Sequence, residues 1–161
     1  MRSGPILAVK FRRRRLGLTN YKKRLALVKS KKSRLIVRIS NQYIKLQVVN
    51  FEEKGDKVLL SVNSKELRTH GWKGGLKNIP AAYLTGYLLG SKAKKLKVKE
   101  LILDSGLVNP NARIMAAVKG VSDSGLSIPF SEDVAPVEER LSGVHISEDV
   151  KKNFEEVKKK L

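Results

Sequence analysis

Residues 34–49, RLIVRISNQYIKLQVV, contain two short runs in which aliphatic and polar side chains alternate. Alternation with a period of two is typical of a β-strand that buries one face. The linker 40–42 is short enough to close a hairpin, in which Asn41 tolerates a positive φ. KVLLSVN (57–63) continues the pattern after a turn. We therefore predict an antiparallel meander of three strands, in which the inward-facing residues of the third strand are Val58, Leu60 and Val62.

The segments after the meander have helical and buried-strand patterns. NIPAAYLTGYLLG (78–90) begins a helix that runs to about residue 97, and Gly86 and Gly90 within it indicate close packing rather than flexibility. ELILD (100–104) is a buried strand, and 111–125 is a second helix. Its inward-facing residues are predicted to be Ile114, Met115, Val118 and Val121. Strand, helix, strand and helix in this order require a right-handed crossover and at least one parallel pair. The predicted fold is α/β (α+β mixed): the meander extended by a further strand through helical crossovers, with helices packed on the sheet.

Positive charge is concentrated at one end of the chain. The first 50 residues contain 15 Lys or Arg and no Asp or Glu. Residues 51–130 hold 13 basic and 7 acidic side chains, and residues 131–161 hold 6 and 8, within a net charge of +19. Like charges at this density oppose compaction unless a polyanion neutralises them. A solvated tail, a localisation signal and an anionic membrane are alternatives, but a membrane-binding helix needs an apolar face that this segment lacks. Nucleic acid is therefore the favoured partner.

Residues 1–18 show no sustained periodicity, and we predict an extended basic arm. Thr19 and Asn20 are good N-caps for a short helix over 21–30. A helix this short and this positive is marginal alone. We expect it to show its cations outward and to dock on the domain through Leu25, Leu27 or Val28.

The C-terminal segment differs in charge and pattern. Residues 131–142 are acidic and are predicted to be irregular. Ser147 caps a further helix, whose acidic first turn and basic last turn complement the helix dipole. Its apolar stripe should pack on this domain or on a neighbour, and consists of Val150, Phe154, Val157 and Leu161. The predicted divisions of the chain are 1–33 (basic arm and short helix), 34–130 (mixed α/β domain) and 131–161 (C-terminal segment and amphipathic helix).

No catalytic or metal-binding pattern is found in the sequence. There is no cysteine, which excludes disulfides and thiol chemistry. His70 and His145 lack metal-site spacing, and the carboxylates of 51–130 are not paired as metal-dependent nucleases or polymerases require. The sequence GWKGG (71–75) lacks phosphate-loop spacing, and Asp104 is interpreted as a turn residue. Apolar runs are too short for a membrane span or a signal peptide. We predict a soluble, intracellular protein that is not an enzyme and has no cofactor or metal.

The basic segment fits RNA better than DNA. Arginines suit bidentate phosphate contacts, and the sheet face opposite the aliphatic one carries Arg38, Tyr43, Lys45 and Gln47. Aromatic side chains available to stack on unpaired bases are Tyr21, Tyr43, Trp72 and Tyr83. No helix-turn-helix, zinc finger or basic zipper supports DNA binding.

Several separated segments resemble one ribosomal protein family. They are FRRRRLGLTNYKKRLALVKSKKSRLIVRISNQYI (11–44), SKELRTHGWKGG (64–75), NIPAAYLTGYLLG (78–90), LDSGL (103–107) and IPFSE (128–132). In this order they resemble the archaeal form of universal large-subunit ribosomal protein eighteen, a family related to the eukaryotic large-subunit protein five. The resemblance covers roughly residues 5–142 and leaves the role of 143–161 open.

The resemblance implies a cytoplasmic, non-catalytic constituent of the large ribosomal subunit. Its implied partners are 5S rRNA, 23S rRNA and neighbouring proteins of the central protuberance, with no membrane and no DNA. The positions implied to bind RNA are Arg12, Arg13, Arg14, Arg15, Thr19, Asn20, Tyr21, Lys22, Lys23, Arg24, Arg38, Ser40, Asn41, Tyr43, Trp72 and Lys73. The alternatives are a non-ribosomal RNA-binding protein or RNA chaperone, and an RNA-modifying enzyme, for which no cofactor pocket or carboxylate cluster is visible in the sequence.

Overall fold

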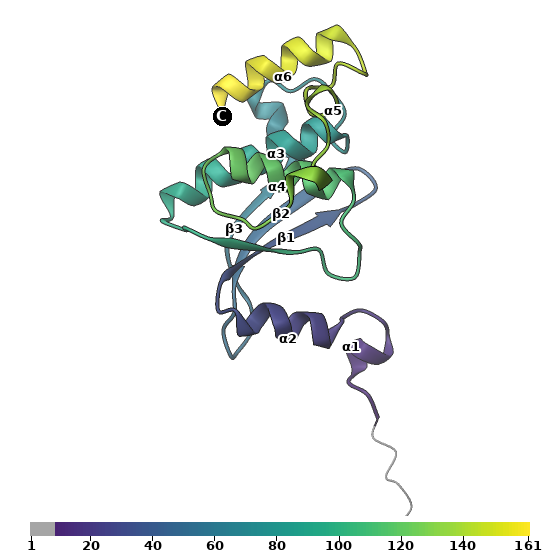
Figure 1. The fold of residues 1–161 in the computed structure, drawn as a ribbon, viewed down its shortest axis with the longest axis vertical. Coiled ribbons are helices and arrows are strands. Elements are labelled where there is room, and N and C mark those ends of the chain that lie inside the picture. Colours follow the sequence, from purple (N-terminus) through teal and green to yellow (C-terminus); the bar gives the residue numbers. More distant parts are fainter. Residues whose placement is uncertain (1–8) are drawn as a thin grey trace, which may run out of the picture.

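A computed structural model describes residues 9–161, which form a mixed sheet with helices on both sides (Figure 1). The four strands are β1 (Ser33–Ile39), β2 (Ile44–Asn50), β3 (Lys57–Asn63) and β4 (Leu101–Asp104). Their order in the sheet is β3-β2-β1-β4. β1–β2 and β2–β3 are antiparallel, and β1–β4 is parallel. The predicted meander, and its extension by a parallel strand, are confirmed.

The helices lie where the capping residues predicted most of them. They are α1 (Arg12–Arg15), α2 (Tyr21–Lys29), the 3₁₀ helix η1 (Ser64–His70), α3 (Ile79–Lys95), α4 (Ala112–Asp123), the 3₁₀ helix η2 (Glu132–Val134), α5 (Glu138–Ser142) and α6 (Glu148–Lys160). Helices α2, α3, α4 and α6 begin at a side chain that accepts a backbone hydrogen bond. These N-caps are Asn20, Asn78, Asn111 and Ser147. A cap accounts for one of the amides that a helix start leaves unpaired.

The core lies between the sheet and the pair α3 and α4. Leu35 and Val37 of β1 are buried, and so are alternate residues of β2 and the predicted inward-facing residues of α4. Ile39, at the end of β1, is half-buried. A Cβ atom on Gly86 would collide with the carbonyl oxygen of Ala117, and one on Gly90 would collide with the Ser124 hydroxyl. The two helices therefore cross with backbone against backbone, which confirms the prediction that these glycines mark close packing.

Strand β3 differs from the prediction at Val58, the first of its predicted inward-facing residues. Val62 is buried and Leu60 is half-buried, but Val58 is 49% exposed. The pairing of β2 with β3 shifts register between Val48 and Val49, and such an irregularity changes which residues oppose one another beyond it. Because β3 is also the edge strand, its first residues lie outside the core.

Two further local predictions are wrong. Arg12–Arg15 forms one helical turn instead of extended arm, and Glu138–Ser142 is a short helix instead of irregular chain. Among residues 9–161 the non-glycine residues with positive φ are Lys31 and Lys97, so the hairpin does not use the positive φ that Asn41 could tolerate. The hairpin loop is closed instead by Ser40, whose hydroxyl accepts from the Tyr43 amide at 2.9 Å.

No helix in the described part of the chain is long and apolar enough to cross a bilayer. The prediction for residues 1–8 lies outside the described residues.

Candidate nucleic-acid interface

The basic arm folds back on the start of α2. The Arg13 Nε donates a hydrogen bond to the Thr19 hydroxyl at 2.8 Å, and the rings of Phe11 and Tyr21 lie 5.6 Å apart. All four side chains of α1 are exposed. Successive residues of a helix point about 100° apart, so one turn presents four guanidinium groups over a wide arc. Thr19 and Asn20 thus shape the arm, while the arginines remain available for an anion.

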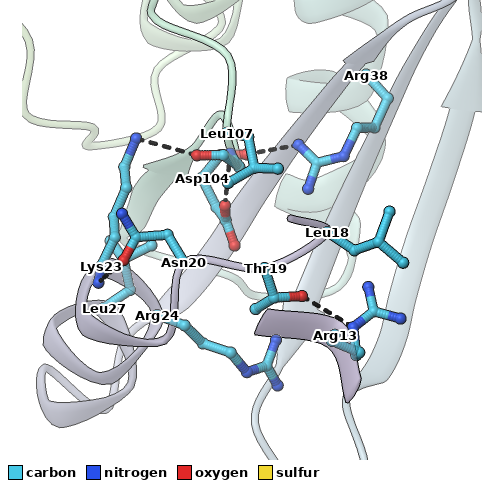
Figure 2. A pocket seen from close by; sticks show the side chains of 11 residues that line it. Arg13, Leu18, Thr19, Asn20, Lys23, Arg24, Leu27, Arg38, Asp104 and Leu107 are labelled. Atoms are coloured by element: carbon cyan, nitrogen blue, oxygen red, sulfur yellow. Dashed lines mark hydrogen bonds between the residues drawn. The ribbon is translucent and has the colours of Figure 1, made fainter. Parts of the chain in front are cut away.

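Helix α2 lies on the side of the sheet opposite α3 and α4 (Figure 1). None of residues 21–29 is buried. Of the three residues expected to dock the helix, Leu25 is 56% exposed, whereas Leu27 and Val28 are half-buried, so Leu27 and Val28 rather than Leu25 fit the expectation. Polar contacts also hold the helix. The Lys23 ammonium donates to the Ser105 hydroxyl at 3.2 Å. It also donates to a carbonyl in the turn after β4 at 3.3 Å (Figure 2).

A chain of ion pairs connects α2 to the sheet through a buried arginine. Arg24 donates to the Asp56 Oδ1 at 2.9 Å, and the Arg34 Nη2 lies 2.7 Å from the same oxygen, an ion pair without good hydrogen-bond alignment. The Arg34 Nη1 donates to the Asp104 Oδ2 at 3.1 Å, and Arg34 is only 1% exposed. A buried guanidinium needs such partners because an unpaired one would lose its hydration uncompensated. Arg34 and the two carboxylates are therefore structural groups.

The same contacts determine the charge of Asp56. Partial burial raises the pKa of this carboxyl, but the close contacts with Arg24 and Arg34 and the positive charges of both outweigh burial and hold the pKa below its ordinary value. Asp56 is therefore ionised at neutral pH. Because its charge is matched by two arginines, it subtracts little from the positive field of the arm.

Arm, helix and sheet meet in one cationic groove. Residues of all three line a surface pocket beside the turn after β4 (Figure 2). The predicted RNA-binding residues among them are Arg13, Thr19, Asn20, Lys23, Arg24 and Arg38. Arg38 is exposed, and its Nη1 donates to the carbonyl oxygens of Val37 and Asp104 at 2.9 and 3.3 Å. The fold thus gathers charges from residues 13 to 38, which we call the arm groove.

Arg38 also lines a second pocket of about 300 Å³ at the hairpin, together with Ser40 and Asn41. Lys77 and Arg113 lie in the same pocket and were missed by sequence reasoning. Each lies at the beginning of a helix, next to the cap of α3 or within the first turn of α4. The beginning of a helix favours anions, so a basic residue near each of two N-caps could have indicated an anion-binding position. Nothing in the sequence indicated that the two helices begin next to the hairpin.

Trp72 does not belong to this surface. The indole is 1% exposed, and its Nε1 donates to the Gly75 carbonyl oxygen at 3.0 Å. A Cβ on Gly74 would collide with the ring, so the glycine-rich turn wraps around the indole. Tyr83 is also buried, with its hydroxyl 2.7 Å from Asp123. The prediction that Trp72 and Tyr83 are available to stack on bases is therefore wrong, because both rings contribute their apolar area to the core.

The other predicted aromatic and loop residues are more accessible. Tyr21 and Tyr43 are half-buried, and Lys73 is exposed. Lys73 is separate from the arm groove, because its loop contacts α6. Among residues 9–161 no group of three His, Asp or Glu side chains could hold a metal ion.

Comparison with known proteins assigns the chain to a family. The family described as "Ribosomal large subunit proteins 60S L5, and 50S L18" matches residues 7–102. "Large ribosomal subunit protein uL18" of Korarchaeum cryptofilum is 50% identical over 150 residues, which are 92% of this chain and 77% of the relative. The protein of the same name from Methanoregula boonei is 47% identical over 165 residues, 98% and 95% of the two chains. That of Sulfurisphaera tokodaii is 49% identical over 91% of this chain and 76% of its own.

These matches agree with the resemblance predicted from the sequence and with a protein that is not an enzyme. The family match runs from the basic arm into β4, so it includes the basic residues of the arm groove, strands β1 to β3 and the beginning of β4. The chain belongs to the family of ribosomal large-subunit proteins 60S L5 and 50S L18.

Proposed function

We propose that this protein is a structural constituent of the large ribosomal subunit that binds 5S rRNA and helps to attach it to 23S rRNA in the central protuberance. The observation that carries the proposal is the arm groove, in which Arg13 of the exposed helical turn Arg12–Arg15 lines one pocket with Lys23 and Arg38. The carboxylates of Asp56 and Asp104 are already paired with Arg34. Such a surface attracts phosphates and offers them little repulsion.

Two kinds of contact would act together. The arginines of α1, with Lys22, Lys23 and Arg24, neutralise phosphates and release counterions, which supplies affinity. The hairpin determines the register of the RNA, since its exposed groups are suited to unpaired bases and sugar hydroxyls. The residues assigned to the hairpin contact are Arg38, Asn41, Tyr43, Lys77 and Arg113. Ser40 supports the loop through its internal hydrogen bonds, and Trp72 supports the core.

Salt dependence of binding tests this function. If about 6–10 phosphates are neutralised, affinity for a 5S rRNA transcript should fall by roughly 10³–10⁵ between 50 and 200 mM salt. Replacing all four arginines of Arg12–Arg15 by Gln should reduce the slope of log affinity against log salt by about four units, since each lost phosphate contact removes about one.

A matched control removes the same charge elsewhere. Lys94, Lys95, Lys97 and Lys99 are exposed around the end of α3, and replacing all four by Gln should leave the slope nearly unchanged. A flat titration of the wild-type protein, or an equal effect in both variants, would show that the arm groove is not the RNA site. Stoichiometric sedimentation with large subunits at moderate salt separates a ribosomal constituent from a free RNA chaperone.

A further inference from the structure

Helix α6 lies at the end of the molecule opposite the arm (Figure 1), beyond residues 7–102 of the family match. Phe154 and Val157 are buried against the domain, and the Phe154 ring centroid lies 5.5 Å from that of Tyr83. Buried aromatic contacts of this kind hold a helix in one place. The helix was predicted to pack on this domain or on a neighbour, and it packs on this domain. Its position is therefore fixed relative to the residues that it contacts.

Asn153 of α6 holds the glycine-rich loop 71–75. Its Oδ1 accepts from the Lys73 amide at 2.9 Å, and its Nδ2 donates to the Gly71 carbonyl oxygen at 3.0 Å. Both ends of one side-chain amide thus bind the backbone of one loop, on either side of Trp72. The bonds join residues 80 and 82 positions apart in the chain, so α6 and the loop hold one another in place.

The loop needs such a support because its own sequence is permissive. Three of its five residues are glycine, and glycine loses more conformational freedom on ordering than any other residue. Trp72 anchors one side of the loop in the core, and Lys73, the next residue, is exposed. The Lys160 ammonium lies beside Gly71, 3.7 Å from where a Cβ would be. The end of α6 therefore adds a cation to the same surface.

We propose that Asn153 is a positioning residue for RNA binding: it holds the glycine-rich loop so that Lys73 meets an RNA phosphate in a preordered geometry. This inference rests on the proposed function. It assigns to α6 the role of preordering a second, smaller phosphate contact away from the arm groove. RNA is favoured over an acidic protein because Lys73 lies on a loop whose backbone is held in place. A cation in a fixed position suits the regularly spaced phosphates of an RNA backbone. A loop fixed before binding loses less conformational entropy when it binds.

The test compares Asn153→Ala with Asn153→Asp, which can still accept from the Lys73 amide but cannot donate to Gly71. Alanine favours a helix more than asparagine does, so α6 itself should persist in the first variant. Hydrogen exchange of the Lys73 amide, measured without RNA, should be at least about tenfold faster in Asn153→Ala and close to wild type in Asn153→Asp. Val144→Ala, at an exposed and uncharged side chain in the loop before α6, is the control and should change nothing.

Binding to a 5S rRNA transcript is the second measurement. Asn153→Ala should weaken it about 3- to 10-fold, the effect of disordering one or two side chains. Lys73→Gln should weaken it similarly, and the double variant should be little worse than either, because one residue acts through the other. Acrylamide should quench the fluorescence of Trp72, the single tryptophan, more strongly in Asn153→Ala, because its indole becomes more accessible.

The possible failures are distinct. An unchanged Lys73 amide in Asn153→Ala would overturn the positioning role directly. A faster amide with wild-type RNA affinity, or additive effects of Asn153→Ala and Lys73→Gln, would overturn it while the arm groove keeps its function. Binding of an acidic protein in place of RNA at the loop would do the same. Failure of the wild-type protein to bind the transcript would overturn the proposed function, and this inference with it.

Discussion

Helices α2 and α6 lie at opposite ends of the molecule and are attached by opposite means (Figure 1). No residue of α2 is buried, and it is held by the contacts of Lys23 and Arg24. Helix α6 buries Phe154 and Val157. An ionic contact weakens with salt and can be exchanged for a phosphate, whereas an apolar contact cannot. The comparison indicates that the α6 end is fixed by burial, whereas the basic α2 end, the proposed RNA-binding end, is attached by charges that a phosphate could replace.

The largest difference should appear when one apolar side chain is removed from each helix. Phe154→Ala should lower the free energy of unfolding by about 3–5 kcal/mol, because it leaves a cavity beneath α6. Leu25→Ala in α2 should change it by less than about 0.5 kcal/mol, since the side chain is mostly exposed. Urea unfolding followed by circular dichroism measures both. Equal losses would mean that α2 is as integral to the core as α6.

Removal of a charged partner should affect the attachment of α2. Asp56→Asn leaves Arg34 with Asp104 as its carboxylate partner and releases Arg24, so we expect a loss of about 1–3 kcal/mol, below the value for a fully buried pair because Asp56 is partly exposed. It should also loosen α2, seen as faster hydrogen exchange over residues 21–29. Glu52→Gln is the control, since Glu52 makes only an exposed contact of 3.6 Å with Lys57.

The contacts of Asp56 with Arg24 and Arg34 also predict how the free energy of unfolding depends on pH. Burial raises the pKa of Asp56, but the close contacts and positive charges of Arg24 and Arg34 outweigh it, and the pKa lies below the ordinary 3.8. The stabilisation is therefore complete above about pH 5 and is lost as the pH falls below about 4 through the folded-state pKa. The stability gap between wild type and Asp56→Asn should narrow over that range. A gap that stays constant down to pH 2.5 would contradict the role of the carboxylate charge.

The smallest effects should come from the matching N-caps. Asn20 and Ser147 each accept one backbone hydrogen bond, from Lys23 and Val150, and loss of a cap weakens its helix by about 1 kcal/mol. Ser147→Ala should reduce global stability by that amount, because α6 is docked. Asn20→Ala should instead fray α2 locally and leave global unfolding unchanged, as amide exchange over 21–29 would show. A global loss in Asn20→Ala would mean that α2 unfolds with the core.

Local patterns predicted most of the framework. The alternation over 34–49, the caps of α2, α3 and α6, and the charge of the first 50 residues were all readable, because each depends on neighbours a few positions apart. The arm arginines could be proposed as an RNA site for the same reason: their density needs no fold to explain it. Trp72 shows the limit, since an aromatic residue among glycines and lysines has the composition of a stacking site.

Contacts between segments that are distant in the sequence could not be predicted from local patterns and are visible only in the tertiary structure. In the sequence Arg34 is one more cation of the basic segment, whereas in the structure it is paired with Asp56 and Asp104. Lys77 and Arg113 lie beside the hairpin because the beginnings of two helices converge there. Asn153 met a loop 80 residues away. Periodicity and capping record what a residue does within its own element. Burial of a charge, and the partner of a side-chain amide, depend on which elements pack together, and that follows from the whole core.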